Sequence, residues 1–328
     1  MKYQTKRGLR AAGMAVALTA ALGAAPGSVQ AQNYPSQDIR LICAFPAGSG
    51  ADVLVRYFAE KLRPIAGQTV IVENKVGAGG HIATEFVARS KPDGYTIYVF
   101  AGTGAAAMAA MFKNPPVDVS KTIQVAATIN RQPFMIVVDA KSPHKTLADL
   151  TAAMKKKGDK ATYASAAPPG TILGEIYKQK TGIQAVEVNY KTAPDSLNEL
   201  QNGKLDYGAH DPVFSLAQQR EGRLRILAVS TGERLAASPE LPTMKEAGVD
   251  MDMTIWWAAM VPQGTPKPIV DQINKWFVQM VSSDETKGFL NKFGGDPFIN
   301  TPEKGQEMFL KAIPQWIEFV KIAKLPLF

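Results

Sequence analysis

The chain has 328 residues, of which 46% are hydrophobic and 20% charged, with a formal net charge of +8 and a single cysteine. One cysteine excludes an intramolecular disulfide and a C-x-x-C redox or metal site. The basic residues form no stripe with interleaved aromatic residues, which argues against nucleic-acid binding.

The first 31 residues have the pattern of a secretory signal peptide. Four basic residues precede an apolar stretch over 11–25, and Val29-Gln30-Ala31 follows as a small-residue cleavage site. The stretch is shorter than the ~20 residues that a membrane-spanning helix needs, and no later stretch reaches that length. We predict cleavage after Ala31 and export to the periplasm. The removed segment has four basic and no acidic residues, so the mature chain has 33 basic and 29 acidic residues, a net charge of +4 (33 − 29).

Strand patterns recur along the rest of the chain. They are short runs of β-branched and apolar residues, most of them apolar on both faces. Cys43 falls inside the first run and is expected to be a small core residue. Ten strands are predicted, at 39–45, 69–73, 96–100, 124–129, 134–139, 161–165, 185–190, 205–209, 224–230 and 254–261.

Helical patterns lie between these strands. Leu54, Phe58 and Leu62 recur at a spacing of four after the first strand, and Ile82 and Phe86 do so after the second. The residues Thr146-Leu147-Ala148-Asp149 indicate a capped helix start, and Gly158 ends that helix after a lysine-rich last turn. Beyond the last strand the chain is predicted to be wholly helical, at 267–282, 284–293 and 302–324.

Alternating strands and helices with short loops predict an α/β protein with parallel sheets. Ten strands and a helical tail are too many for one compact sheet, so two lobes are favoured. The crossing points are expected in 124–139 and near Thr254. The first lobe is then discontinuous, with residues 32–132 and 254–328, and the second lobe holds residues 133–253.

Glycine-rich segments after two predicted strands are candidates for ligand contact. In Phe45-Pro46-Ala47-Gly48-Ser49-Gly50-Ala51-Asp52, the glycines permit close backbone approach, and N–H groups at the following helix start favour an anion. The segment lacks a Gly-Lys-Ser/Thr ending and G-x-G-x-x-G, and an ordinary strand–helix turn is an open alternative. Gly77-Ala78-Gly79-Gly80-His81 offers further backbone donors, although a lone histidine is more often a surface or capping residue.

Polar groups at later strand ends complete the candidate site. Ser165 ends a strand, Ala166 follows it, and Gly170-Thr171 opens a helix, so that hydroxyl and N–H groups are available to a carboxylate. Thr171 can also serve as a helix cap. Tyr190, His210 and Asp211 stand at other strand ends, where ligands of open α/β folds bind.

Catalytic patterns do not emerge. The three histidines lack metal-ligand spacing, and Ser49 fails the G-x-S-x-G pattern. Spacing alone leaves open a Ser-His-Asp triad assembled in space, with Ser49 or Ser165 as its nucleophile. We predict a protein with no catalytic residues, metal or cofactor.

Motifs spread over the whole mature chain resemble the Bug (Bordetella uptake gene) family, the solute-binding proteins of tripartite tricarboxylate transporters. They include Phe45-Pro46-Ala47-Gly48, Gly77-Ala78-Gly79-Gly80, Pro92-Asp93-Gly94-Tyr95-Thr96, Thr162-Tyr163-Ala164-Ser165, Tyr190-Lys191, Gly203-Lys204-Leu205-Asp206 and Val261-Pro262-Gln263-Gly264-Thr265-Pro266. The resemblance implies a two-lobed, type II-like periplasmic-binding-protein fold. It also implies a small carboxylate in the interlobe cleft and delivery of that ligand to membrane permease subunits by a monomeric receptor.

Departures from the family pattern bear on the ligand. Ala166-Ala167-Pro168-Pro169 is stiffer and more apolar than the family's usual Gly-, Asn- and Ser-rich segment, which favours hydrophobic contact. Ala209-His210-Asp211 replaces a usual Phe-Asp-Asn, so that His210 can donate to a second carboxylate and Ala209 leaves room for a ring. A dicarboxylate, with an aromatic body as one option, is the hypothesis for the ligand. An alternative is a receptor of the same fold that signals to a membrane sensor kinase.

Overall fold

The computed structural model describes residues 34–325 and 327, and Pro35–Phe328 form one compact unit. The predicted signal peptide and its cleavage site lie outside the described residues. Within the described residues, none of the helices is long and apolar enough to cross a membrane.

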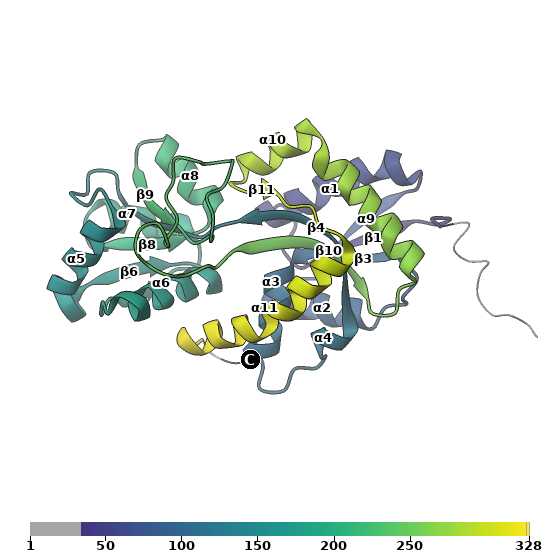
Figure 1. The fold of residues 1–328 in the computed structure, drawn as a ribbon, viewed down its shortest axis with the longest axis horizontal. Coiled ribbons are helices and arrows are strands. Elements are labelled where there is room, and N and C mark those ends of the chain that lie inside the picture. Colours follow the sequence, from purple (N-terminus) through teal and green to yellow (C-terminus); the bar gives the residue numbers. More distant parts are fainter. Residues whose placement is uncertain (1–33, 326, 328) are drawn as a thin grey trace, which may run out of the picture. The chain divides into compact units, whose positions relative to one another are not determined.

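Two β-sheets organise this unit (Figure 1). The six-stranded sheet has the order β11-β4-β10-β3-β1-β2, and the five-stranded sheet has the order β7-β6-β8-β5-β9. The strands are β1 (Ile39–Cys43), β2 (Val70–Asn74), β3 (Thr96–Ala101), β4 (Ile123–Gln132), β5 (Met135–Asp139), β6 (Thr162–Ser165), β7 (Val186–Asn189), β8 (Tyr207–His210), β9 (Leu224–Val229), β10 (Ile255–Pro262) and β11 (Asp296–Pro297).

Helices cover both sheets (Figure 1). They are α1 (Gly50–Ala66), α2 (His81–Ala88), α3 (Gly102–Met111), α4 (Val119–Thr122), α5 (Leu147–Lys157), α6 (Pro168–Thr181), α7 (Leu197–Gln201), α8 (Pro212–Arg220), α9 (Lys267–Ser282), α10 (Asp284–Lys292) and α11 (Pro302–Ile322). Short 3-10 turns lie at Ala78–Gly80, Gly158–Lys160 and Ala193–Ser196.

The two-lobed α/β fold and all ten predicted strands are confirmed, with strand ends displaced by at most three residues. The prediction of parallel sheets was wrong in one respect. Strand β10 runs antiparallel to β3 and β4, and β5 runs antiparallel to β8 and β9. A parallel direction requires a crossover connection, usually a helix, between neighbouring strands. Both β5 and β10 instead enter their sheet directly from the other lobe.

The predicted helices are confirmed, but α2 buries a different face from the one expected. Thr146 and Asp149 form the expected capping box of α5. Ser49 caps α1 by accepting from the Asp52 N–H, and Gly67 ends α1 in the left-handed conformation at φ 64°. In α2, however, Ile82 is exposed, and the buried face consists of Ala83, Thr84 and Val87. Helix α3 and the short β11 were not predicted.

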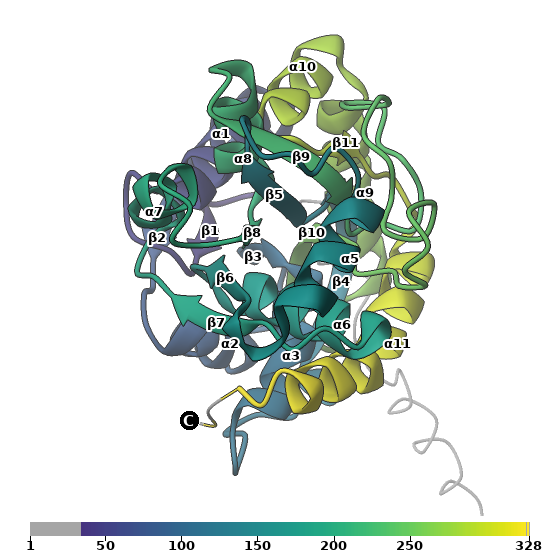
Figure 2. The same cartoon turned by 90° about the vertical axis from the view of Figure 1, so that its left-hand side faces the viewer.

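The lobes are joined by two chain crossings and by α11. The chain passes from β4 to β5 through residues 133–134 and returns through the segment that precedes β10. Helix α11 packs against α3 and β4 beside the six-stranded sheet, and also against α6 beside the five-stranded sheet (Figures 1 and 2). The C-terminal helix therefore contacts both lobes.

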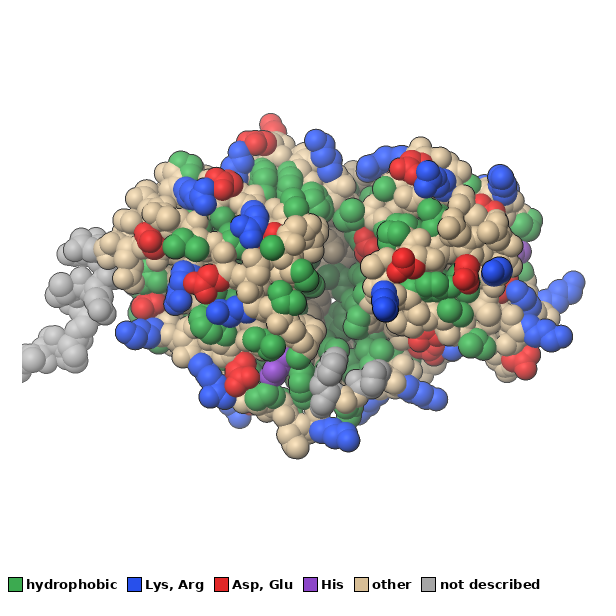
Figure 3. Space-filling model, turned by 180° about the vertical axis from the view of Figure 1, so that it is seen from behind, with side chains coloured by type: hydrophobic (Ala, Val, Ile, Leu, Met, Phe, Trp, Pro, Cys, Tyr) green, Lys and Arg blue, Asp and Glu red, His purple; other side chains and the backbone are tan. Residues whose placement is uncertain are grey.

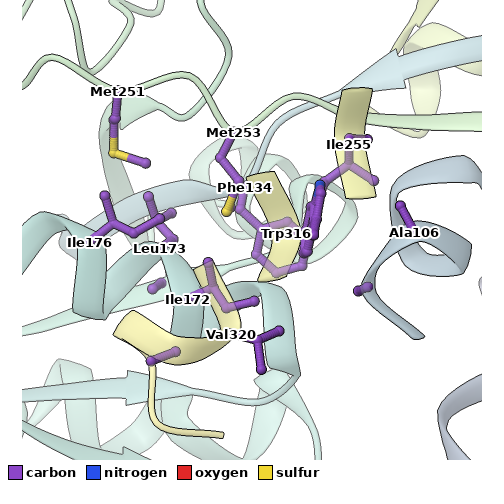
Figure 4. Packing of buried hydrophobic residues seen from close by; sticks show 14 of the residues in the cluster. Ala106, Phe134, Ile172, Leu173, Ile176, Met251, Met253, Ile255, Trp316 and Val320 are labelled. Carbon is purple, nitrogen blue, oxygen red and sulfur yellow. The ribbon is translucent and has the colours of Figure 1, made fainter. Parts of the chain in front are cut away.

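One hydrophobic core continues from lobe to lobe. Trp316 and Val320 of α11 lie close to Phe134, Ile172 of α6 and Ile255 of β10 (Figure 4). Cys43 is fully buried in β1, as expected of a core residue.

Candidate ligand-binding site

A cavity of about 450 Å³ lies between the two lobes. Figure 3 shows the groove between the lobes, with hydrophobic side chains in its depth. The lining residues come from the ends of β1 and β3, the turn before α2, helix α3, the first crossing, the start of α6, strand β10 and helix α11. They are Ala44, Phe45, Pro46, Val76, Gly77, Gly79, Gly80, Phe100, Ala101, Thr103, Gly104, Ala107, Met108, Met111, Gln132, Phe134, Ala167, Pro168, Pro169, Ile172, Ile255, Trp257, Trp316 and Val320.

The lining is mostly apolar and includes several aromatic rings. The ring of Phe45 lies 5.6 Å from that of Phe100 and 6.0 Å from that of Trp257, between centroids. Thr103 and Gln132 supply the polar side chains, and none of the lining residues is charged. Such a cavity suits a ligand with an apolar body and few polar groups.

The loop after β1 is closed by a network around Asp52. The Asp52 carboxylate is 1% exposed and accepts from Gly48 N–H at 2.8 Å, Arg56 Nε at 2.8 Å and Asn74 Nδ2 at 2.7 Å. Burial alone would raise the pKa of Asp52, but these hydrogen bonds outweigh burial and hold the pKa below its usual value. The α1 N-terminus therefore already faces a carboxylate of the chain. Of the residues predicted in this loop, Phe45 lines the cavity, whereas Ala47, Gly48, Ser49, Gly50 and Asp52 do not.

The glycine-rich turn before α2 reaches the cavity through its backbone. Gly79 and Gly80 line the cavity with φ values of 62° and 101°. A Cβ on Gly80 would lie 2.8 Å from the Phe100 ring. His81, the next residue, is 5% exposed and points elsewhere, with its ring 4.2 Å from that of Phe112. Burial lowers the pKa of His81.

Hydroxyl groups predicted in the second lobe are engaged within the chain. The hydroxyls of Ser165 and Thr171 both donate to Glu187, and the Tyr190 hydroxyl donates to Glu199 at 2.8 Å. Burial, followed by the Glu199 carboxylate, raises the pKa of Tyr190 to about 12. Ser165, Ala166, Gly170, Thr171 and Tyr190 are not among the lining residues, but Ala167, Pro168 and Pro169 are.

The end of β8 also faces away from the cavity. His210 is 1% exposed, and its Nε2 lies 3.0 Å from Ser196 Oγ. Burial lowers the pKa of His210 to about 4, so the ring is neutral at neutral pH. Asp211 caps α8 by accepting from Phe214 N–H at 3.0 Å, and burial raises its pKa. Neither residue lines the cavity.

Sequence reasoning missed the wall formed by α3. Thr103 is 2% exposed, and in the described part of the chain its Oγ1 has no hydrogen-bond partner. The first turn of α3 has no acidic residue and no side-chain cap. The N–H groups of this turn and the Thr103 hydroxyl are therefore available to an anion. Gly102-Thr103-Gly104 directly after β3 was the available signal, because it repeats the strand–glycine–helix pattern of the first loop.

A second hollow, of about 570 Å³, lies beside the interlobe segments and shares Thr103 and Trp316 with the first. Several of its charged groups are matched by the chain itself. Arg131 pairs with Glu233 at 3.3 Å, and Asp252 accepts from Gly232 N–H at 3.1 Å. The Thr103 hydroxyl, which has no hydrogen-bond partner among the described residues, lines both hollows.

The side chains of the described residues do not form a metal site or a serine–histidine pair at the cavity. Among the described residues, no group of three or more His, Cys, Asp and Glu side chains is arranged to hold a metal ion. Ser49 accepts from Asp52 N–H and Ser165 donates to Glu187, rather than either serine pairing with a histidine. The Ser196–His210 pair is buried and lies outside the cavity lining.

Comparison with known proteins supplies the family. The model of the tripartite tricarboxylate transporter family receptor (TctC) matches residues 54–321. The chain belongs to this receptor family. A UPF0065 protein of Bordetella bronchiseptica is 33% identical over 299 residues, which cover 90% of this chain and 87% of that protein.

Solved structures of TctC relatives match the fold. R. palustris Rpa4515 with adipate is 27% identical, with a TM-score of 0.76 and coverage of 90% of this chain and 100% of that one. The periplasmic binding protein BugD is 28% identical, with a TM-score of 0.73 and the same coverage. The resemblance to the Bug family is thereby confirmed.

Proposed function

We propose that this TctC-family chain is an extracytoplasmic solute receptor that captures a small carboxylate with an apolar body and catalyses no reaction. The observation that carries the proposal is the interlobe cavity, whose polar side chains are Gln132 and Thr103, and the Thr103 hydroxyl, at a helix N-terminus, has no hydrogen-bond partner among the described residues. The apolar walls suit the body of the ligand, and the helix N-terminus suits its carboxylate.

The ligand's carboxylate is placed at the N-terminus of α3. Thr103 Oγ1 and the free N–H groups of the first turn are its donors, since no charged side chain lines the cavity. The N-termini of α1 and α6 are less open. That of α1 faces Asp52, and that of α6 begins with Pro168 and Pro169, which have no N–H group.

Of the residues predicted from the sequence, Phe45, Gly79 and Gly80 are proposed to contact the ligand. Thr103 and Trp257 are added to them from the cavity lining. Other predicted residues hold the walls in place from behind, through the hydrogen bonds of Asp52, Ser165 and Asp211.

Closure of the lobes is the proposed binding mechanism. Residues 32–132 with 254–328 form one lobe and residues 133–253 form the other, and they move about the two crossings. A ligand that contacts both lobes stabilises the closed state. A micromolar ligand corresponds to about −8 kcal/mol.

The relatives support the carboxylate class and the transport role. Rpa4515 was solved with adipate, and the family is named for its tripartite transporter. We propose that the chain works in the periplasm, after cleavage at Ala31, as a monomer that delivers its ligand to the permease subunits of such a transporter.

The site also bears on whether the ligand has one carboxylate or two. The sequence-based hypothesis was a dicarboxylate, with an aromatic body as one option and with His210 donating to the second carboxylate. His210 is 1% exposed and lies outside the cavity lining, so this donor is not available. The aromatic lining still supports an aromatic or otherwise apolar body.

A thermal-shift screen of the exported protein tests the proposal. The panel holds mono- and dicarboxylated benzenes, aliphatic mono- and dicarboxylates, tricarboxylates, amino acids and neutral analogues. At 100 times its dissociation constant a ligand adds about 2.7 kcal/mol of stability, which raises Tm by a few degrees. We expect a shift with an apolar carboxylate. A shift with neutral or cationic solutes alone would overturn the proposal.

A further inference from the structure

A carboxylate of the chain itself occupies the hydroxyl pair at the start of α6. Glu187 is a half-buried residue of the edge strand β7. Its Oε1 accepts from Ser165 Oγ at 2.5 Å and from Thr171 Oγ1 at 2.5 Å. The two hydroxyl oxygens lie 3.1 Å apart, and Asn189 Nδ2 donates to Ser165 Oγ at 3.0 Å. This is the geometry of a bound carboxylate, with the carboxylate supplied by the chain.

The hydroxyl pair lies next to the wall of the ligand cavity. Ser165 and Thr171 bracket in sequence the three residues Ala167, Pro168 and Pro169 that line the cavity at this end. Ser165 is fully buried and Thr171 is 4% exposed. The Glu187 carboxylate is therefore bonded to residues within two positions of this wall in the sequence.

The first turn of α6 offers a ligand anion no free N–H group from Pro168, Pro169, Gly170 or Thr171. Pro168 and Pro169 have no N–H group. The N–H groups of Gly170 and Thr171 both donate to the carbonyl of Ala167, at 2.8 and 3.2 Å. The hydroxyl protons of Ser165 and Thr171 are given to Glu187.

The negative charge at this wall is not neutralised by a salt bridge. The nearby carboxylates Glu175 and Asp206 pair with Lys178 and Lys157, but across the described residues Glu187 forms no ion pair. A second carboxylate brought to this end of the cavity meets a like charge, which disfavours it.

We propose that Glu187 determines specificity by filling the second lobe's anion site with its own carboxylate, which restricts the receptor to solutes with one carboxylate. The ligand's carboxylate lies at α3 and its uncharged end lies against Pro168, Pro169 and Ile172. This inference rests on the proposed function, because it assigns the number of charges on the ligand of the same cavity.

Isothermal calorimetry with matched ligand pairs tests the inference. The pairs are benzoate with benzene-1,4-dicarboxylate, and hexanoate with adipate. For the unaltered protein we expect the monocarboxylate of the preferred pair to have a Kd at least about tenfold lower than that of the matching dicarboxylate. Glu187→Gln keeps an acceptor for the hydroxyls but removes the charge, so it should bring the ratio of the dicarboxylate Kd to the monocarboxylate Kd closer to one. Glu187→Ala frees both hydroxyls, so it should reverse the preference toward the dicarboxylate.

Glu199→Gln is the matched control. Glu199 is another half-buried carboxylate of the same lobe, and it accepts from Tyr190 rather than from Ser165 or Thr171. This variant should leave the ratio unchanged. Cooperative melting of every variant establishes that it is folded.

Two outcomes overturn the inference while the proposed function stands. The first is an unaltered protein that binds the dicarboxylate as tightly as the monocarboxylate. The second is a ratio that fails to move in both Glu187 variants, or moves equally in Glu199→Gln. If folded protein binds none of the four acids while a neutral or cationic solute binds, the proposed function fails as well.

Discussion

Replacing Thr103 by valine should have opposite effects on ligand binding and on stability. The substitution keeps the shape of the side chain and exchanges Oγ1 for a methyl group. Oγ1 is buried at the cavity wall, and in the described part of the chain nothing donates to it or accepts from it. In the ligand-free protein the unpaired hydroxyl therefore lowers the stability of the folded state. In the complex it donates a hydrogen bond to the ligand's carboxylate.

The two magnitudes follow from this environment. A hydrogen bond to a charged group contributes about 1.5–3 kcal/mol, so Thr103→Val should weaken carboxylate binding roughly 10- to 100-fold. An unsatisfied buried polar group costs about 1–3 kcal/mol, so its removal should raise the free energy of unfolding by up to that amount. Calorimetry with the best acid of the thermal-shift screen measures the first quantity, and urea denaturation without ligand measures the second.

Thr128→Val is the matched control. Thr128 is also buried, but its Oγ1 donates to the Phe298 carbonyl at 2.5 Å and accepts from Asn300 Nδ2 at 3.2 Å. Loss of this hydroxyl leaves two groups unpaired, so the control should lose about 1–3 kcal/mol of stability and keep its affinity. The reasoning is refuted if Thr103→Val binds the acid with unchanged Kd, or if it loses stability as the control does.

Two further predictions concern the backbone of the site and the buried histidine. Gly80→Ala should cost about 1–3 kcal/mol of stability and weaken binding, because φ is 101° and the new Cβ meets the Phe100 ring at 2.8 Å. Gly182→Ala is the control, because Gly182 has φ 75° and no atom lies within 4 Å of the new Cβ. It should cost about 1 kcal/mol of stability and leave Kd unchanged. If the two variants changed Kd equally, the assignment of Gly80 to the cavity would be contradicted. The pKa of His210 is about 4 in the folded protein and ~6.5 in the unfolded chain. Between these pH values the unfolded state binds more protons than the folded state. The free energy of unfolding therefore falls as the pH falls from ~6.5 through 4. His210→Gln should remove on the order of 3 kcal/mol of that pH dependence, measured by urea denaturation at pH 7 and pH 4, and an unchanged dependence would show that His210 is not buried in its neutral form.

Much of the fold was predictable because it depends on local patterns. Most strands are short and apolar on both faces, as buried strands must be, and each predicted strand is present. The α5 capping box and the α1 C-terminal Gly67 were also readable, since caps depend on residues a few positions apart. Helix α3 escaped prediction because its face toward the cavity and its face toward the core are both small and apolar, which erases helical periodicity.

The candidate site was predicted only in part, because strand ends mark where side chains start but not what they contact. Phe45, Gly79 and Gly80 line the cavity as the motifs suggested. Ser165, Thr171, Tyr190 and His210 have hydroxyl and ring groups of the expected kind, but each is bonded to another side chain of the chain. Glu187 is not close to Ser165 in sequence, so no spacing rule points to their contact.

The two-lobed α/β class, the strands with their order along the chain, and the receptor family were all predictable from the amino-acid sequence, because each depends on local propensity or on motifs in a fixed order. Tertiary structure alone decided the direction of β5 and β10, the α3 wall with the unpaired Thr103 hydroxyl, and the capture of Ser165 and Thr171 by Glu187. The physical reason is that hydrogen bonds and burial are properties of neighbours in space. A buried donor is available to a ligand only when the folded chain supplies it with no acceptor.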